Sequence, residues 1–162
     1  MSVTSIDKDL DSLTMTVTAE FDVTADRAWQ LWADPRQLER WWGPPTYPAT
    51  VEEHDLRPGG KVTYFMTGPE GDTPRGYWDV LEVQAPRMLT VKDGFADDDG
   101  TPLDGMGITG MRMDIVDRAG GGVVMTLAST FSSLESLEQM LAMGMEEGLR
   151  EAMGQIDGLL AA

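Results

Sequence analysis

The end of the chain carries a single apolar stripe with helical spacing. The stripe consists of Leu137, Leu141, Met145, Leu149, Ala152, Ile156 and Leu159. This spacing predicts one long helix that begins at Ser132 or Ser133 and has one apolar face. Such a helix has to bury that face against another layer of structure, and the segments before it supply the layer.

Those earlier segments mostly show the two-residue alternation of strands. In "LTMTVTAEF", residues 13–21, apolar residues occupy every second position, which predicts a strand with one buried face. Six later segments also have strand character: "ATVEEHDL", "KVTYFMT", "RGYWDVLEVQ", "RMLTVKD", "ITGMRMDIVD" and "GGVVMTLASTF". Two short helical segments, which begin after Thr24 and at Pro35, separate the first strand from the others.

This order of elements predicts an α+β fold in one domain, residues 1–162. Short connections between consecutive strands favour a curved, seven-stranded antiparallel sheet, with two short helices after the first strand. The long C-terminal helix covers the apolar face of the sheet. A strongly curved sheet around one helix leaves room for a hollow between the two layers.

Charge and composition exclude several classes of function. The net charge is −16, and no basic stripe interrupts the acidic surface, so nucleic acids and anionic membranes are poor partners. No apolar run is long enough to span a bilayer, and no leader precedes the first strand, so we expect a cytoplasmic protein. With no cysteine and with His54 as the only histidine, we expect no metal site and no cofactor.

The stretch "ERWWGPP", residues 39–45, places two tryptophans where the second short helix ends. Trp41 and Trp42 project about 100° apart on a helical turn, so both cannot fill the same narrow stripe. We therefore expect one ring to anchor the short helices against the sheet and the other to form part of the mouth of the hollow.

Apolar residues at strand and helix positions that face the hollow are candidates for binding a ligand. Methionine is abundant, with twelve residues, and it packs into irregular cores as readily as it lines a deformable cavity, so both readings stay open. The predicted ligand-binding residues are Trp41, Trp42, Tyr64, Met66, Trp78, Met111, Met113, Met125, Leu141 and Met145.

Two carboxylates in "YWDVLEV", residues 77–83, are candidates for acid–base chemistry. Asp79 and Glu82 belong to opposite alternation sets, so whichever set faces the hollow brings one acid toward it. A carboxyl group against an apolar cavity has a raised pKa and can act as a general acid or base. The alternative is that these acids lie at a strand end and pair with a nearby arginine.

Several motifs occur together in an order typical of one protein family. They are Trp41-Trp42-Gly43-Pro44, then Asp55-Leu56-Arg57-Pro58-Gly59-Gly60, then Gly68-Pro69-Glu70-Gly71, and the segment from Val80 to Leu89. This series resembles the "WWGP … DxRPGG … GPDG" pattern of the Hsp90-ATPase-activator-homologue (AHSA1-like) family, which belongs to the START/Bet v 1-like (SRPBCC) superfamily. The resemblance extends from about Leu13 to Leu160 and implies a helix-grip fold.

The resemblance, with the predicted hollow, suggests three functions. The leading hypothesis is the binding of a small, mostly apolar molecule between the sheet and the C-terminal helix. The second is an enzyme of the cyclase, aromatase or hydratase type that uses a cavity carboxylate or tyrosine. The third is a chaperone-associated interaction module, like an Hsp90 activator, and a homodimer remains open in all three cases.

Overall fold

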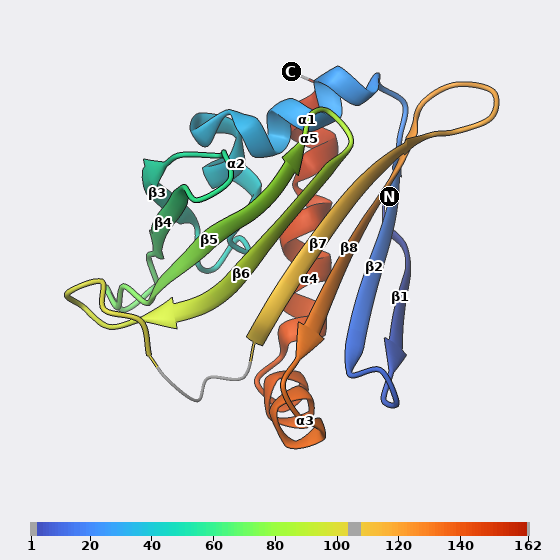
Figure 1. Ribbon diagram of the computed structural model, residues 1–162. Coiled ribbons are helices and arrows are strands. Elements are labelled where there is room, and N and C mark those ends of the chain that lie inside the picture. Colours follow the sequence, from blue (N-terminus) through green and yellow to red (C-terminus); the bar gives the residue numbers. More distant parts are fainter. Residues whose placement is uncertain (1–2, 104–107, 162) are drawn as a thin grey trace.

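In the part of the chain that the structure describes, eight antiparallel strands form one sheet (Figure 1). The computed structural model describes residues 3–103 and 108–161. The strands are β1 (Val3–Asp9), β2 (Thr14–Phe21), β3 (Ala49–His54), β4 (Lys61–Met66), β5 (Arg75–Gln84), β6 (Met88–Ala96), β7 (Ile108–Asp117) and β8 (Val123–Phe131). Their order in the sheet is β1-β2-β8-β7-β6-β5-β4-β3, so β2 lies between the first strand of the sequence, β1, and the last, β8.

The predicted sheet of seven strands is therefore one strand short. The missing strand is β1, which pairs with β2 along its length, for example Ile6 with Val17. Only Val3 and Ile6 of β1 are partly buried, and the other five residues are exposed. A polar edge strand of this kind lacks the apolar alternation by which strands are recognised in a sequence.

Within these described ranges, five helices complete the fold: α1 (Ala25–Ala33), α2 (Pro35–Trp41), α3 (Leu134–Ala142), α4 (Met145–Gly154) and α5 (Ile156–Ala161). The Thr24 side chain caps α1 by accepting from the Arg27 amide, and Asp34 caps α2 by accepting from the Arg36 amide. None of the helices in the described residues is long and apolar enough to cross a membrane.

The predicted continuous C-terminal helix is interrupted after α3. Gly144 has φ +88°, a left-handed conformation that ends one helix and starts the next at a different angle. Figure 1 shows α4 and α5 running along one face of the sheet, whereas α3 lies beyond its end. The apolar stripe is accordingly divided: Leu137 belongs to the smaller core cluster with Met15, whereas Ile156 and Leu159 belong to the main core.

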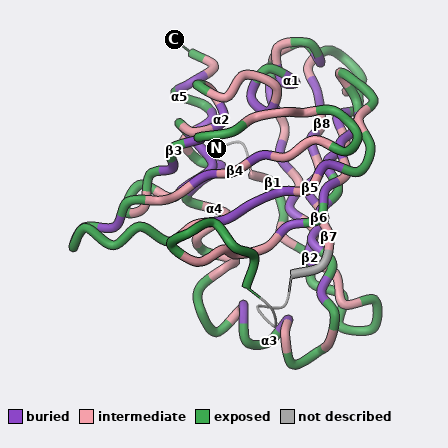
Figure 2. The backbone as a smooth tube through the Cα atoms, turned by 60° about the vertical axis from the view of Figure 1, so that its left-hand side comes forward, coloured by how far each residue is buried: buried purple, intermediate pink, exposed green. Residues whose placement is uncertain are grey.

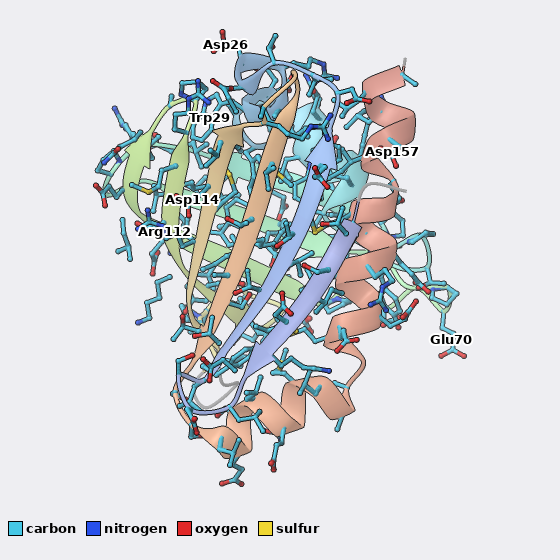
Figure 3. The ribbon with its side chains drawn as sticks, turned by 90° about the vertical axis from the view of Figure 1, so that its right-hand side faces the viewer. Asp26, Trp29, Glu70, Arg112, Asp114 and Asp157 are labelled. Atoms are coloured by element: carbon cyan, nitrogen blue, oxygen red, sulfur yellow. The ribbon has the colours of Figure 1, made fainter. Side chains whose placement is uncertain are left out.

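The core lies between the inner face of the sheet and the helices. Figure 2 shows buried positions along the strands and on the helix sides that meet them, while the loops extending from the sheet are mostly exposed. On β7 the inner residues are Met111, Met113 and Ile115, all buried. Figure 3 shows Arg112 and Asp114 on the opposite side of the sheet from the C-terminal helices, where they form an ion pair of 2.8 Å.

Candidate functional site

A cavity of about 170 Å³ lies between the inner face of the sheet and the C-terminal helices. Strands β4, β6, β7 and β8 form one wall, helices α3 and α4 form the other, and the segment after α2 closes one side. The lining residues are Trp42, Pro44, Tyr64, Met66, Asp93, Phe95, Met111, Leu127, Ser129, Met140, Met145, Gly148, Leu149 and Ala152. Most of these side chains are apolar, so the cavity favours an apolar occupant.

Trp42 reaches the cavity because the chain turns sharply directly after α2. Gly43 follows it, and a Cβ at that position would collide with the carbonyl of Tyr47. The turn is held against the C-terminal helices by Gln155, whose Nε2 donates to the Gly43 carbonyl at 2.7 Å. The break in the "WWGPP" stretch thus fixes one indole ring as part of the cavity wall.

Trp41 has a different environment from its neighbour. It is fully buried, and its Nε1 donates to the carbonyl of Leu31 at 2.9 Å. In a continuing helix that carbonyl would accept from residue 35, but Pro35 has no N–H. The Trp41 indole therefore supplies the donor that the end of α1 lacks, and it joins α1 to α2.

The two tryptophans belong to one aromatic cluster with Trp32, Trp78 and Tyr64. The Trp42 ring centroid lies 4.9 Å from that of Trp78 and 6.1 Å from that of Tyr64, both in edge-to-face contacts. Such edge-to-face contacts stabilise the packing of the rings beyond what the burial of their surface area contributes. The buried Nε1 atoms of Trp42 and Trp78 meet no hydrogen-bond acceptor in the described part of the chain.

Asp93 is the one carboxylate among the cavity-lining residues. The register of the sheet places it on β6 opposite Trp78 of β5, and it is only 9% exposed. Burial raises the pKa of its carboxyl group to about 7, and a hydrogen bond from the Gly94 backbone acts weakly in the other direction. The group therefore changes its protonation state near neutral pH.

Tyr64 and Ser129 are the other polar side chains of the lining. Burial, and to a smaller extent the nearby Asp93 carboxylate, raise the pKa of the Tyr64 hydroxyl, so it stays neutral at physiological pH. The nearby indole N–H of Trp42 opposes this shift, although its geometry to the Tyr64 hydroxyl is not that of a hydrogen bond. The Ser129 residue is 4% exposed and lies on β8 level with Met111.

Sequence reasoning missed both Asp93 and Ser129, although each leaves a signal. Asp93 follows Leu89 and Val91 in the inward set of β6, and Ser129 follows Leu127 in the inward set of β8. A polar residue within an otherwise apolar alternation set is the signal that could have identified them. At Asp93 this signal was hidden because the predicted strand ended at that residue, and a polar residue is common at a strand end.

The expectation that Asp79 or Glu82 faces the hollow is corrected by a β-bulge. The pairing of β5 with β6 shifts by one residue between Val80 and Glu82, which leaves Leu81 unpaired. Glu82 is thereby turned to the outer face with Leu81, and it accepts from Gln84. Asp79 is half-exposed, with its carboxylate 3.9 Å from Lys61 Nζ.

The predicted apolar site residues fall into two groups. Those that line the cavity are Trp42, Tyr64, Met66, Met111 and Met145. Those outside the lining are Trp41, Trp78, Met113 and Met125, which are buried in the main core, and Leu141, which packs beside the smaller core cluster around Met15. The inward direction of the strands was therefore predictable, but the extent of the cavity along each strand was not.

Larger hollows on the outside of the molecule have a different character. One of about 550 Å³ is lined by charged residues that include Arg87, Asp117 and Arg118, and these are engaged in ion pairs. Within residues 3–103 and 108–161, no group of three or more His, Cys, Asp or Glu residues could hold a metal ion. The cavity beside Asp93 thus combines an apolar lining with a carboxylate that forms no ion pair in the described part of the chain.

Comparison with known proteins identifies relatives. Residues 22–161 match the family described as "Activator of Hsp90 ATPase homolog 1-like protein", which confirms the family resemblance seen in the sequence motifs. No curated protein matches this chain significantly.

Two similar solved structures are 48% identical to this chain. The crystal structure of protein Ms6760 from Mycobacterium smegmatis has a TM-score of 0.89 and aligns over 98% of each chain. The solution structure of a protein from Arthrobacter aurescens has a TM-score of 0.93 and aligns over 99% of this chain and 92% of its own. The AHSA1 protein from Silicibacter pomeroyi, at 21% identity and a TM-score of 0.68, shares the fold over 91% of this chain and 97% of its own.

Proposed function

This chain belongs to the family of activator of Hsp90 ATPase homolog 1-like proteins, and we propose that it binds a small, mostly apolar molecule between the sheet and α4. The observation that carries the proposal is the cavity of about 170 Å³ between the sheet and the C-terminal helices, which is mostly apolar and opens to the surface. A ligand that fills such a cavity removes its exposed apolar lining from water, and this burial supplies the driving force for binding.

The size of the cavity sets the size of the occupant. An engineered apolar cavity of roughly 150 Å³ is known to stay dry and to bind benzene. A cavity of about 170 Å³ therefore suits a molecule with one ring or a short branched chain. The methionine side chains at positions 66, 111, 140 and 145 can change rotamer to fit somewhat different shapes.

Native mass spectrometry of the protein purified from its own host tests this function. We expect a fraction of the protein to carry one additional small mass, which is lost on denaturation and identified afterwards by fragmentation. As a control, the variant Gly148→Leu should carry no such mass, because its side chain enters the cavity. Host-purified protein that carries no additional mass, and that takes up no apolar probe either, would contradict the proposal.

An enzymatic function of the cyclase, aromatase or hydratase type is the second candidate, and Asp93 is the observation that favours it. A carboxyl group whose pKa is about 7 exchanges protons readily near neutral pH, and this carboxylate lies close enough to Tyr64 to help raise the pKa of its hydroxyl. The retained molecule, once identified, would be returned to the wild-type protein and to Asp93→Asn. Chemical conversion by the wild type alone supports catalysis, whereas binding without conversion supports a carrier.

The chaperone-associated module and the homodimer stay predictions. An interaction module of the predicted kind has a filled core and an exposed apolar patch. Here the core contains a cavity, and the exposed large apolar residues of the described chain belong to separate elements and loops, such as Leu10 before β2 and Leu81 on β5. These observations favour ligand binding.

A further inference from the structure

The charge distribution inside the cavity is one-sided. Its lining contains the Asp93 carboxylate but no lysine, arginine or histidine among the described residues. The ion pairs of the described chain do not include Asp93. The hydrogen bond from the Gly94 backbone is the interaction that favours its charged form.

A buried carboxylate without a cation destabilises a folded protein, so its presence calls for an explanation. Within the sheet, Asp93 occupies a position that an apolar residue would fill at no such cost, since Val91 and Phe95 flank it in the same inward set. Its paired neighbour on β5 is Trp78, whose ring is buried in the main core, whereas the cavity offers a route by which an interaction partner reaches Asp93.

The remaining walls also suit a cation with an apolar body. Three aromatic side chains, Trp42, Tyr64 and Phe95, line the cavity with Asp93. Aromatic rings attract a cation through their electron-rich faces, and most strongly where water is excluded. The polar Ser129 hydroxyl on β8 offers a further acceptor beside them.

The net charge of the whole protein also favours a cationic ligand. Its net charge of −16 raises the local concentration of cations and repels anions. Figure 3 shows acidic side chains on different sides of the molecule, including Asp26, Glu70 and Asp157. A cationic molecule thus approaches the protein with electrostatic assistance from several directions.

We propose that the cavity binds a small primary amine with an apolar body of about single-ring size, whose ammonium group pairs with the Asp93 carboxylate. The inference rests on the proposed function and narrows its ligand to one chemical class. The apolar body occupies the space between Met111 and Leu149, and the ammonium supplies the cation that residues 3–103 and 108–161 do not place beside Asp93.

Three probes of nearly the same size test the inference: benzylamine, benzyl alcohol and ethylbenzene. They differ in one terminal group, which is a cation, a neutral donor or a methyl group. Binding to the full chain is measured by isothermal titration calorimetry at about pH 8, where the Asp93 carboxyl group is ionised and benzylamine is still largely protonated. We expect benzylamine to bind about tenfold or more tightly than either neutral probe.

The pH dependence of benzylamine binding is a second readout. Tyr64 is the other titratable group facing Asp93 among the described lining residues, and it stays neutral across the range used. Since the Asp93 carboxyl titrates near pH 7, affinity for benzylamine should rise about tenfold between about pH 6 and about pH 8. Ethylbenzene affinity should change little over the same interval.

Two variants provide matched controls. Asp93→Asn keeps the shape of the side chain and removes its charge, so it should abolish both the preference for benzylamine and the pH dependence. Asp79→Asn removes the same charge from the outer face of β5, beside Lys61, and should keep both. If Asp93→Asn does not fold, two wild-type measurements still decide the question: the ranking of the three probes by affinity, and the pH dependence of benzylamine binding.

The outcomes separate this inference from the proposed function. Equal binding of all three probes, or a preference for benzylamine that persists in Asp93→Asn, overturns the amine inference and leaves apolar ligand binding intact. Tighter binding of benzyl alcohol than of benzylamine also overturns it. Failure of every probe to bind overturns the inference together with the function on which it rests.

Discussion

Replacing tryptophans by phenylalanine in the aromatic cluster separates the anchoring role of Trp41 from the cavity role of Trp42. Trp41→Phe and Trp42→Phe remove the same atoms, so the losses from transfer and packing are similar to a first approximation. What differs is the indole N–H. In Trp41 it is bound to the Leu31 carbonyl, whereas in Trp42 it meets no acceptor in the described part of the chain.

The difference can be estimated from the two hydrogen-bonding states. Trp41→Phe leaves the buried Leu31 carbonyl without a donor, since Pro35 cannot supply one, and this costs about 1–3 kcal/mol. Trp42→Phe removes a buried donor that is already unpaired, which recovers about 1 kcal/mol. The free energies of unfolding of the two variants should therefore differ by about 3 kcal/mol, which corresponds to roughly 9 °C in Tm for a chain of this size.

Urea denaturation followed by far-UV circular dichroism measures this difference, and calorimetry gives the Tm values. Trp78→Phe is the matched control, because Trp78 is as fully buried as Trp41 but its Nε1 is unpaired like that of Trp42. It should behave like Trp42→Phe. Equal destabilisation by Trp41→Phe and Trp78→Phe, within about 0.5 kcal/mol, would refute the role assigned to the Leu31 hydrogen bond.

Two further predictions follow from single contacts. Because burial raises the pKa of Asp93 from 3.8 to about 7, the folded state holds this proton more tightly than the unfolded chain, and stability from this group falls as pH rises through that interval. The urea midpoint of Asp93→Asn minus that of the wild type should therefore increase between about pH 4 and about pH 7. A difference in midpoint that does not change with pH would contradict the assignment. Gln155→Ala removes the clamp on the Gly43 carbonyl and should cost about 1–2 kcal/mol in urea denaturation, whereas Glu151→Ala, an exposed change on the same helix, should cost less than about 0.5 kcal/mol.

The direction of most strands could be predicted because an apolar alternation has one physical cause, a single buried face. The inward sets of β2 and β8, for example Met15 with Val17 and Met125 with Leu127, are buried as their alternation predicts. Edge strand β1 escaped prediction because pairing at an edge requires only backbone hydrogen bonds, not apolar side chains.

The remaining differences arise from single residues whose effect depends on tertiary structure. One unpaired residue at Leu81 reverses the orientation of Glu82, and the sequence alone does not show that a bulge occurs there. A left-handed Gly144 divides a stripe that looks continuous on a helical projection. The cavity itself depends on where side chains fail to fill space, which a periodic pattern does not determine.

The occupancy of the cavity is tested most directly by titrating ethylbenzene into the wild type and into Gly148→Leu by isothermal titration calorimetry. Gly148 lines the cavity, and a Cβ built there meets no atom within 4 Å, so a leucine side chain can enter the space without a clash. The control Gly154→Leu makes the same change at an exposed position of α4, outside the cavity lining. We expect one bound molecule per chain in the wild type and in Gly154→Leu, and none in a folded Gly148→Leu. Unchanged binding in folded Gly148→Leu, or none in the wild type, would contradict the claim that this cavity is the binding site.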